Sequence, residues 1–184
     1  MHHKAVQVLG MDAATTLGRY GLRGEIAYTR TDSTRTASTP WSSKPFLYLV
    51  AGGDRTFDDN LNVNLQYFAY RVSDYTDPRN IADPLARSIA VENAVGINQL
   101  EKDKQGISAH LSKTWMNDTL EGEISSVIAF GSSDYVVLKP RLVYAVTDRF
   151  KVTLGADIFR GEAQSTFGRL RDASTGFIEL KHSF

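Results

Sequence analysis

The sequence contains no cysteine and no long apolar run. Without cysteine the chain has neither disulfide bonds nor thiolate metal sites, and it can pass through an oxidising compartment without pairing thiols. A membrane-spanning helix needs roughly 18 or more consecutive apolar residues. Because no window of the sequence supplies such a run, a helical membrane protein is excluded.

Net charge is also absent, because 21 Lys and Arg residues balance 21 Asp and Glu residues. A balanced chain has no electrostatic preference for nucleic acid, so we expect no nucleic-acid partner. The 184 residues suit one sizeable domain, and a mean hydropathy of −0.27 is ordinary for a soluble protein. Two classes fit this composition: a soluble all-β domain, or a transmembrane β-barrel, whose polar lumen gives it a soluble-like composition.

The dominant pattern is an alternation of polar and apolar residues with period two, which is typical of β-strands. In the clearest stretch, YVVLKPRLVYAVT, Leu138 and Leu142 fall on one face and Lys139 and Arg141 fall on the other. The same alternation recurs along the chain and indicates an antiparallel all-β fold. It predicts nine strands, at about 4–16, 20–31, 45–56, 60–73, 104–116, 119–131, 134–146, 149–160 and 173–184.

Strand length and loop length both favour the membrane class. Soluble strands average about 5–6 residues, whereas a tilted strand needs about 9–11 residues to cross a bilayer; most of the predicted strands reach that length. The predicted connections are short on one side of the sheet and long on the other, which is typical of outer-membrane barrels with short periplasmic turns. The short ones are 17–21, 57–60, 116–118 and 147–149; the alternate set is 31–44, 74–103 and 161–172, with only 131–134 short.

Aromatic residues are predicted to gather at both ends of the strands. Such belts are typical of the two membrane interfaces of a barrel, although aromatic-rich strands in a soluble core are the alternative. The residues beside the short turns are Tyr20, Phe57, Trp115, Phe150 and Phe184, and those nearer the long loops are Tyr28, Trp41, Phe46, Phe130 and Tyr135.

The chain ends in GFIELKHSF, where alternation places Gly176, Ile178, Leu180, His182 and Phe184 on one face. This ending resembles the C-terminal signal of bacterial outer-membrane proteins. The resemblance implies that the barrel-assembly machinery recognises the last strand and that the terminal aromatic lies at the periplasmic interface. His182 departs from the pattern, which prefers a tyrosine or an apolar residue there. The alternative is a soluble barrel whose last strand ends in phenylalanine.

Longer stretches carry a second resemblance. RLVYAVTDRFKVTLGADIFRG, FGRL, GMDAATTLGRYGLRGEIAYTR and AGGDRTFDDNLNVNLQYFAY are similar to hairpins of bacterial outer-membrane porin-like barrels, an uncharacterised group related in architecture to the alginate-export porins. The similarity covers most of the chain except 74–103. It implies an up-and-down transmembrane β-barrel in the bacterial outer membrane, surrounded by lipid, and it does not indicate the solute.

Nine strands do not fit a complete bacterial barrel, which normally has an even number with both termini periplasmic. The first residues, MHHKAVQVLG, also lack the apolar core of a signal peptide. We therefore expect residues 1–184 to be a single barrel domain or the C-terminal portion of a larger barrel. The alternative is that Lys4–Thr16 is not a strand, which leaves eight.

The segment 74–103 is predicted to be a long extracellular loop. Asp83 and Pro84 form a favourable N-cap and first helical residue, which predicts a short helix folded near the pore mouth. An extension of a strand around Ile89–Ile97 is the alternative.

The sequence predicts no catalytic constellation, cofactor or metal site, because the four histidines lack metal-ligand spacing. The polar face is instead predicted to line an aqueous lumen, since a charge in hydrocarbon costs up to several kcal/mol. Lys139 and Arg141 are expected to form a charged ladder with Lys151 and Asp157 on the next strand. The predicted pore-lining residues are Arg23, Glu25, Asn62, Asn64, Gln66, Glu121, Glu123, Lys139, Arg141, Lys151, Asp157, Glu179 and Lys181.

These patterns favour a porin-like passive channel for small polar or charged solutes, and not an enzyme. Two alternatives remain. One is a non-conducting outer-membrane scaffold. The other is a soluble lipocalin-like β-barrel, in which the apolar face points inward and the charged face outward.

Overall fold

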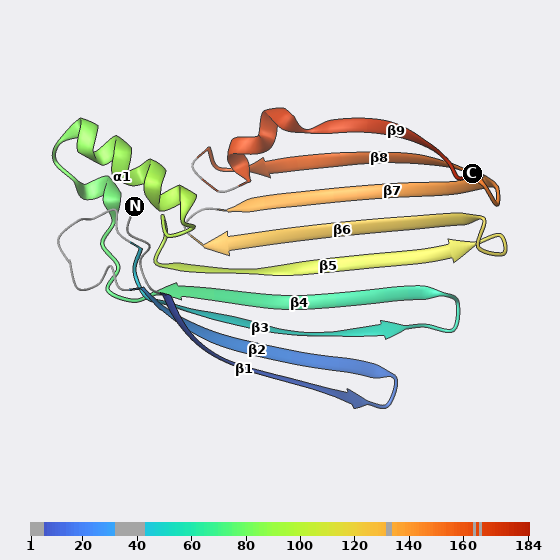
Figure 1. Cartoon of the computed structure of the whole chain (residues 1–184), viewed down its shortest axis with the longest axis horizontal. Helices are drawn as coiled ribbons and strands as arrows, with labels where there is room; N and C mark the ends of the chain where they lie inside the picture. Colours follow the sequence, from blue (N-terminus) through green and yellow to red (C-terminus); the bar gives the residue numbers. More distant parts are fainter. Residues whose placement is uncertain (1–5, 32–42, 132–133, 164, 166) are drawn as a thin grey trace.

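The computed structural model describes residues 6–31, 43–131, 134–163, 165 and 167–184. In that part of the chain, nine antiparallel β-strands form one sheet in sequence order, with β1 and β9 at opposite edges (Figure 1). This confirms the predicted all-β, up-and-down fold. The strands are β1 (Val6–Leu17), β2 (Tyr20–Thr31), β3 (Phe46–Thr56), β4 (Leu61–Val72), β5 (Asp103–Trp115), β6 (Leu120–Gly131), β7 (Tyr135–Thr147), β8 (Phe150–Gly161) and β9 (Thr175–His182).

The sheet is open, because β1 and β9 pair with β2 and β8 and not with each other. The predicted alternative of eight strands is wrong, since Val6–Leu17 pairs with β2 along its whole length. Every residue of β1 is exposed, as are nearly all residues of β9. Both edges of the sheet therefore carry unpaired backbone groups.

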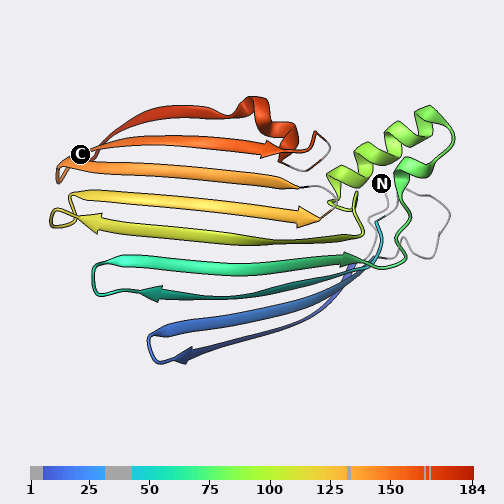
Figure 2. The same ribbon diagram turned by 180° about the vertical axis from the view of Figure 1, so that it is seen from behind.

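The connections divide by length as predicted. Short turns join β1 to β2, β3 to β4, β5 to β6 and β7 to β8 at one end of the sheet, called here the turn end. The first of them uses Gly18 at φ +62°, a backbone conformation that glycine adopts without steric cost. The C-terminus lies at the turn end, and α1 lies at the opposite, loop end (Figures 1 and 2).

The loop between β4 and β5 contains the 3₁₀ helix η2 (Pro78–Asn80) and the α-helix α1 (Pro84–Gly96), which confirms the predicted helix. The Asp83 carboxylate accepts a hydrogen bond of 2.7 Å from the Ala86 backbone N–H, the expected N-cap. The alternative of a strand around Ile89–Ile97 is wrong. Among the described residues, no helix has the length and apolarity needed to cross a membrane.

The cross-strand register gives the sheet two chemically different faces. One face, the apolar face, presents side chains such as Leu65, Ile124, Leu142 and Leu154, which the register assigns to the same side of the sheet. These side chains are uncovered: Leu154 is 56% exposed and Leu142 is 43% exposed. The opposite face, the polar face, carries most of the charged residues between the strand ends, and the charged residues of the apolar face, such as Arg55, Lys113 and Arg160, lie near the ends of the strands.

The buried core lies on the polar face at the loop end. Tyr70, Val72, Ala129 and Val137, which all belong to this face by register, are buried. The cover comes from segments of the loops, whose buried residues include Ala90, Ala94, Gln99 and Leu100. Packing therefore occurs on the face with the charges, and no second layer covers the apolar face in the described part of the chain.

Two glycines on the polar face let aromatic rings lie flat against the sheet. Phe68 pairs across strands with Gly106, and Phe177 pairs with Gly155. A Cβ added at either glycine would lie 2.5 Å from the ring Cζ atom, which no real contact allows. The missing side chains thus make room for the rings.

We predict that Gly155→Ala destabilises the fold by about 1–3 kcal/mol, because Phe177 must leave its position over the strand. The matched control is Gly176→Ala on β9, where an added Cβ approaches nothing closer than 3.8 Å. That control should change stability by less than about 1 kcal/mol. The midpoint of urea unfolding, followed by circular dichroism, measures both effects; equal midpoints for the two variants would contradict the predicted role of Gly155.

Candidate functional site

The register places all thirteen predicted pore-lining residues on the polar face. Arg141 is paired with Glu123 on β6, and Lys151 is paired with Lys181 on β9. Arg23 on β2 belongs to the same face through its pairing with Gly52, which is paired in turn with Gln66. Alternation within each strand was therefore sufficient to assign these side chains to a common face.

Opposite charges pair along this face. Lys139 Nζ lies 3.6 Å from Asp157 Oδ1, and Arg23 Nη2 lies 3.6 Å from Asp54 Oδ1. The imidazole Nδ1 of His110 also lies 3.8 Å from Glu123 Oε1. The first pair matches part of the predicted ladder.

The rest of the predicted ladder differs from the structure. Lys151 faces Lys181 across the strand pair, and the Arg141 guanidinium lies 5.9 Å from the Phe177 ring centroid. The predicted set also omitted Asp54, Lys104 and His110, which share this face. Continuing the alternation through β3 and β5 would have found them.

A hollow of about 530 Å³ lies in the middle of the polar face. Side chains from four successive strands line it, together with Phe167 from the loop between β8 and β9, so this face is concave. The polar side chains that line it are Asn62, Asn64 and Gln66 of β4, Ser108 and His110 of β5, Ser125 of β6, and Lys139 of β7.

One cluster beside the hollow contains a serine, a histidine and a glutamate. His110 Nδ1 lies 3.0 Å from Ser125 Oγ, and Ser125 Oγ lies 3.5 Å from Glu123 Oε1. In a catalytic triad the hydroxyl and the carboxylate bind different nitrogens of the imidazole ring. Here both approach the same nitrogen, so the cluster lacks the geometry of a triad.

Aromatic side chains surround the loop end of the polar face. The Phe167 ring stacks on Phe159 at 6.2 Å with an interplanar angle of 6°, and it lies 5.1 Å from the Tyr135 ring. Phe167, which follows β8, lines the same hollow as Asn62, Asn64 and Gln66 of β4. The sheet is therefore curved, with the polar face inside.

The predicted aromatic belts are only partly right. Tyr28 and Phe130 lie on the apolar face, but Phe46 and Tyr135 belong to the polar face by register and cannot join an outward belt. Trp41 lies outside the described residues.

At the turn end, cations accompany the aromatic rings of the apolar face. The Arg55 guanidinium lies 4.6 Å from the Tyr20 ring centroid and 4.4 Å from that of Phe57. Lys113 Nζ lies 6.0 Å from the Trp115 ring centroid. Rings and cations together are typical of a boundary between an apolar and an aqueous phase.

The predicted C-terminal assembly signal also follows the register. Ile178 pairs with Leu154, Leu180 with Val152, and His182 with Phe150, all on the apolar face. Gly176 shares that face through its pairing with Ala156. The exposed Phe184 lies just beyond β9, with its ring 4.9 Å from the His182 ring.

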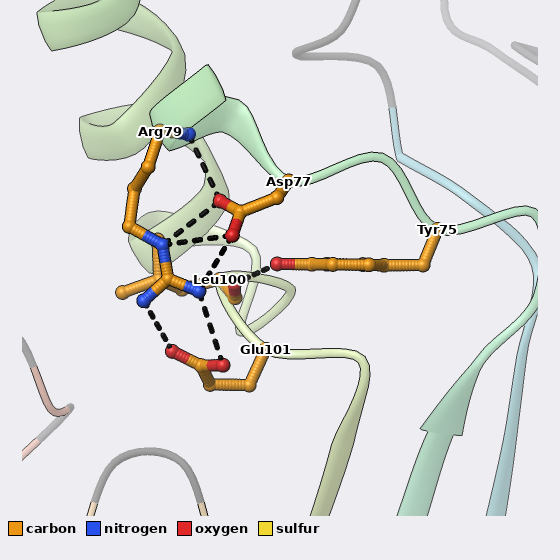
Figure 3. A network of polar contacts seen from close by, with 5 residues as sticks. All are labelled: Tyr75, Asp77, Arg79, Leu100 and Glu101. Atoms are coloured by element: carbon orange, nitrogen blue, oxygen red, sulfur yellow. Dashed lines mark hydrogen bonds and ion pairs between the residues drawn. The ribbon is translucent and has the colours of Figure 1, made fainter.

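The loop between β4 and β5 is anchored by a charged network (Figure 3). The Arg79 guanidinium donates hydrogen bonds to Asp77 at 2.8 and 2.9 Å and to Glu101 at 2.9 and 3.3 Å. The Glu101 side chain is only 4% exposed. Beside it, the Tyr75 hydroxyl donates to the Leu100 carbonyl.

Ionisation reinforces this anchor. Burial by itself would raise the pKa of Asp77. Hydrogen bonds from the Arg79 guanidinium and backbone N–H lower this pKa by more than burial raises it, so the pKa lies below its ordinary value. Burial raises the pKa of Tyr75 to about 12, so its hydroxyl stays protonated as a donor. The ionised Asp77 carboxylate therefore stabilises the folded state at pH values above about 4, the ordinary pKa of aspartate. This stabilisation is lost as the pH falls through the lowered pKa of the folded state.

The loop between β4 and β5 and the loop between β8 and β9 both fold over the polar face and contact each other. Arg169, in the 3₁₀ helix η3 (Gly168–Ala173), donates hydrogen bonds of 2.8 and 3.2 Å to the Glu92 carboxylate on α1. Hydrogen bonding from Arg169 lowers the pKa of Glu92. Lys104 on the polar face donates to Asn98 at 2.6 Å.

Buried Gln99 exchanges two 2.8 Å hydrogen bonds with the Lys44 backbone. These contacts join residues far apart in the sequence, so no local pattern predicted them.

Comparison of the chain with protein-family models, curated proteins and solved structures finds no match. Within the described residues, no group of three or more His, Asp and Glu side chains is arranged to hold a metal ion.

We predict that Arg79→Ala releases the loop between β4 and β5, because it leaves the Glu101 carboxylate buried without this partner. The free energy of local opening should fall by about 1–3 kcal/mol. Amide hydrogen exchange across residues 73–102 measures this opening. The matched control is Arg87→Ala, at an exposed position of α1; similar exchange rates in both variants would show that the network does not anchor the loop.

Proposed function

We propose that this chain forms part of the wall of a bacterial outer-membrane β-barrel and lines a passive, porin-like channel for small polar or charged solutes. One observation carries the proposal: the loops cover the charged face of the sheet, and the apolar face is left bare. A soluble lipocalin-like barrel requires the reverse arrangement, with the apolar face inside.

The energetics of the apolar face favour contact with lipid. Burying a leucine or isoleucine side chain is worth about 1.5–3 kcal/mol, and this face exposes many of them, with Leu9 at 78%, Ile178 at 70% and Leu154 at 56% exposure. Soluble monomers rarely expose contiguous apolar areas above about 600 Å². Hydrocarbon chains satisfy this surface without any second protein layer.

Strand length agrees with this environment. Strands β1 to β8 contain 11–13 residues each, and about 9–11 residues are needed for a tilted strand to cross a bilayer. The rings and cations at Arg55 and Lys113 would then lie at the turn-end interface.

The open edges add a requirement. Unpaired backbone N–H and C=O groups cost several kcal/mol each in hydrocarbon, so open sheet edges do not occur there. The proposed wall therefore includes further strands paired with β1 and β9. A wall completed in this way encloses the polar face, its ion pairs and its central hollow in water.

Single-cysteine labelling tests which face of the sheet contacts lipid. The label attaches only at the introduced position, because the chain has no cysteine of its own. We expect a fluorophore at Leu142→Cys and Tyr144→Cys to be quenched by brominated lipid acyl chains. Arg141→Cys and Val143→Cys should instead react with charged, water-soluble thiol reagents. This alternation follows from the strand period of two.

Thr119→Cys, in the turn between β5 and β6, is the control for a position in water. If Leu142→Cys reacts as fast as Arg141→Cys and lipid does not quench its label, the apolar face does not contact lipid. Folding of the protein in plain buffer without detergent would lead to the same conclusion.

Conductance separates a channel from a non-conducting scaffold. In planar bilayers we expect open-channel currents, and Arg141→Glu should raise the permeability of K⁺ relative to Cl⁻ by about twofold or more, because it changes the sign of a charge that faces the pathway. Arg160→Glu, on the opposite face at the loop end, should leave this ratio unchanged. Equal effects of the two variants, or no current at all, would overturn the channel proposal.

A further inference from the structure

The hollow in the polar face combines three chemical features that a charged pore lining does not require. Its floor carries side-chain amides and hydroxyls, its charged neighbours are paired, and one wall is a fixed aromatic ring. From this combination we infer that the hollow binds uncharged, polyhydroxylated, ring-shaped solutes of the sugar class. The inference rests on the proposed function and names the solutes that the channel would select.

The amides of β4 offer donors and acceptors side by side. Gln66 Nε2 donates to Asn64 Oδ1 at 3.3 Å, and Asn62 Nδ2 donates to the Thr56 hydroxyl at 2.9 Å. Each primary amide has two N–H donors and a carbonyl that accepts twice. Among the described residues, no other side-chain hydrogen bond engages Asn64 or Gln66, so both amides keep groups of each kind for a ligand.

A sugar hydroxyl both donates and accepts, so it matches such a lining better than a simple ion does. Ser108 and Ser125 add hydroxyl groups on the neighbouring strands. Adjacent donors and acceptors at fixed strand spacing suit the adjacent hydroxyls of a ring. An inorganic anion would use only the N–H donors, and a cation only the carbonyl acceptors, so the other groups would lack a partner in the ligand.

The charges around the hollow favour an uncharged ligand. Lys139 Nζ and Asp157 Oδ1 lie 3.6 Å apart. A charged solute must compete with these partners, which neutralise each other. A neutral solute can hydrogen-bond to the outer sides of the same groups without separating them.

The aromatic wall is held in place by its own loop. Phe167 is half-buried, stacks on Phe159 and lies tilted against Tyr135. The preceding turn is fixed by buried Ser165, whose hydroxyl accepts from the Gly168 backbone N–H at 2.9 Å and donates to the Glu162 carbonyl at 2.9 Å. A Cβ at Gly168 would lie 2.0 Å from that carbonyl oxygen, so the turn requires glycine there.

A rigid ring beside amides suits a pyranose. The C–H face of a sugar ring is apolar and packs on an aromatic face, and the hydroxyl groups at its edge remain free to bond the amides. The volume of about 530 Å³ falls within the range of about 300–1,000 Å³ that is usual for small-molecule sites.

The test measures the ion current of the protein in planar bilayers while maltotriose is added. We expect a saturable decrease of the current. Polyethylene glycol of equal hydrodynamic size is the control, because it occupies volume without a hydroxyl-bearing ring and should give no saturation. Asn64→Leu should raise the half-saturating maltotriose concentration about threefold to tenfold, as expected for the loss of one or two hydrogen bonds.

Phe167→Ala should raise the same concentration about tenfold, corresponding to about 1.4 kcal/mol. Phe130→Ala, an aromatic truncation on the apolar face at the same end of the sheet, should leave it unchanged. Circular dichroism of each variant verifies that it is folded.

Calorimetric titration of the detergent-solubilised protein with maltotriose separates this inference from the channel proposal. Current without any saturable effect of maltotriose, and without calorimetric binding, overturns the sugar site and leaves the channel intact. Binding that Phe167→Ala weakens, in a protein that passes no current, supports the sugar site and overturns the channel. Saturable block that Phe167→Ala and Phe130→Ala weaken equally also overturns the sugar site.

Discussion

The structure depends on the backbone ladder that keeps nine strands in one register, because in a β-strand the parity of a residue decides its face. A slip of one residue between β7 and its neighbours would move Lys139 and Arg141 to the apolar face of the sheet, and Leu138 and Leu142 to the polar face. The register gathers most ionisable groups of the strand interiors on the concave side, where some of them pair, such as Lys139 with Asp157. It also places most of the apolar side chains on the opposite face.

The loops complete this arrangement by packing on the polar face of the sheet. Their attachment relies on a few polar contacts: the Arg79 guanidinium between Asp77 and Glu101, and the Arg169–Glu92 pair between the two loops. Such charge-assisted hydrogen bonds are stronger than neutral ones. They hold α1 and Phe167 at the loop end of the polar face, so the loops narrow the concave side and do not cover the apolar one.

The proposed contact with lipid and the proposed sugar site use opposite faces of the same sheet. Contact with lipid follows from what is missing on the apolar face, which is any covering layer among the described residues. Selection of a neutral solute follows from what is present on the polar face, where amides, paired charges and a fixed ring share one hollow.

The sequence alone determined the strands, the short turns, the Asp83-capped helix and the face of each predicted pore-lining residue, because all of these depend on neighbours within a few positions. The tertiary structure alone decided that Phe167 closes one wall of the hollow and that Arg79 reaches Glu101. It also left the edges β1 and β9 unpaired. These features arise from curvature and from contacts between residues far apart in the chain, and a local pattern of alternation carries no information about either.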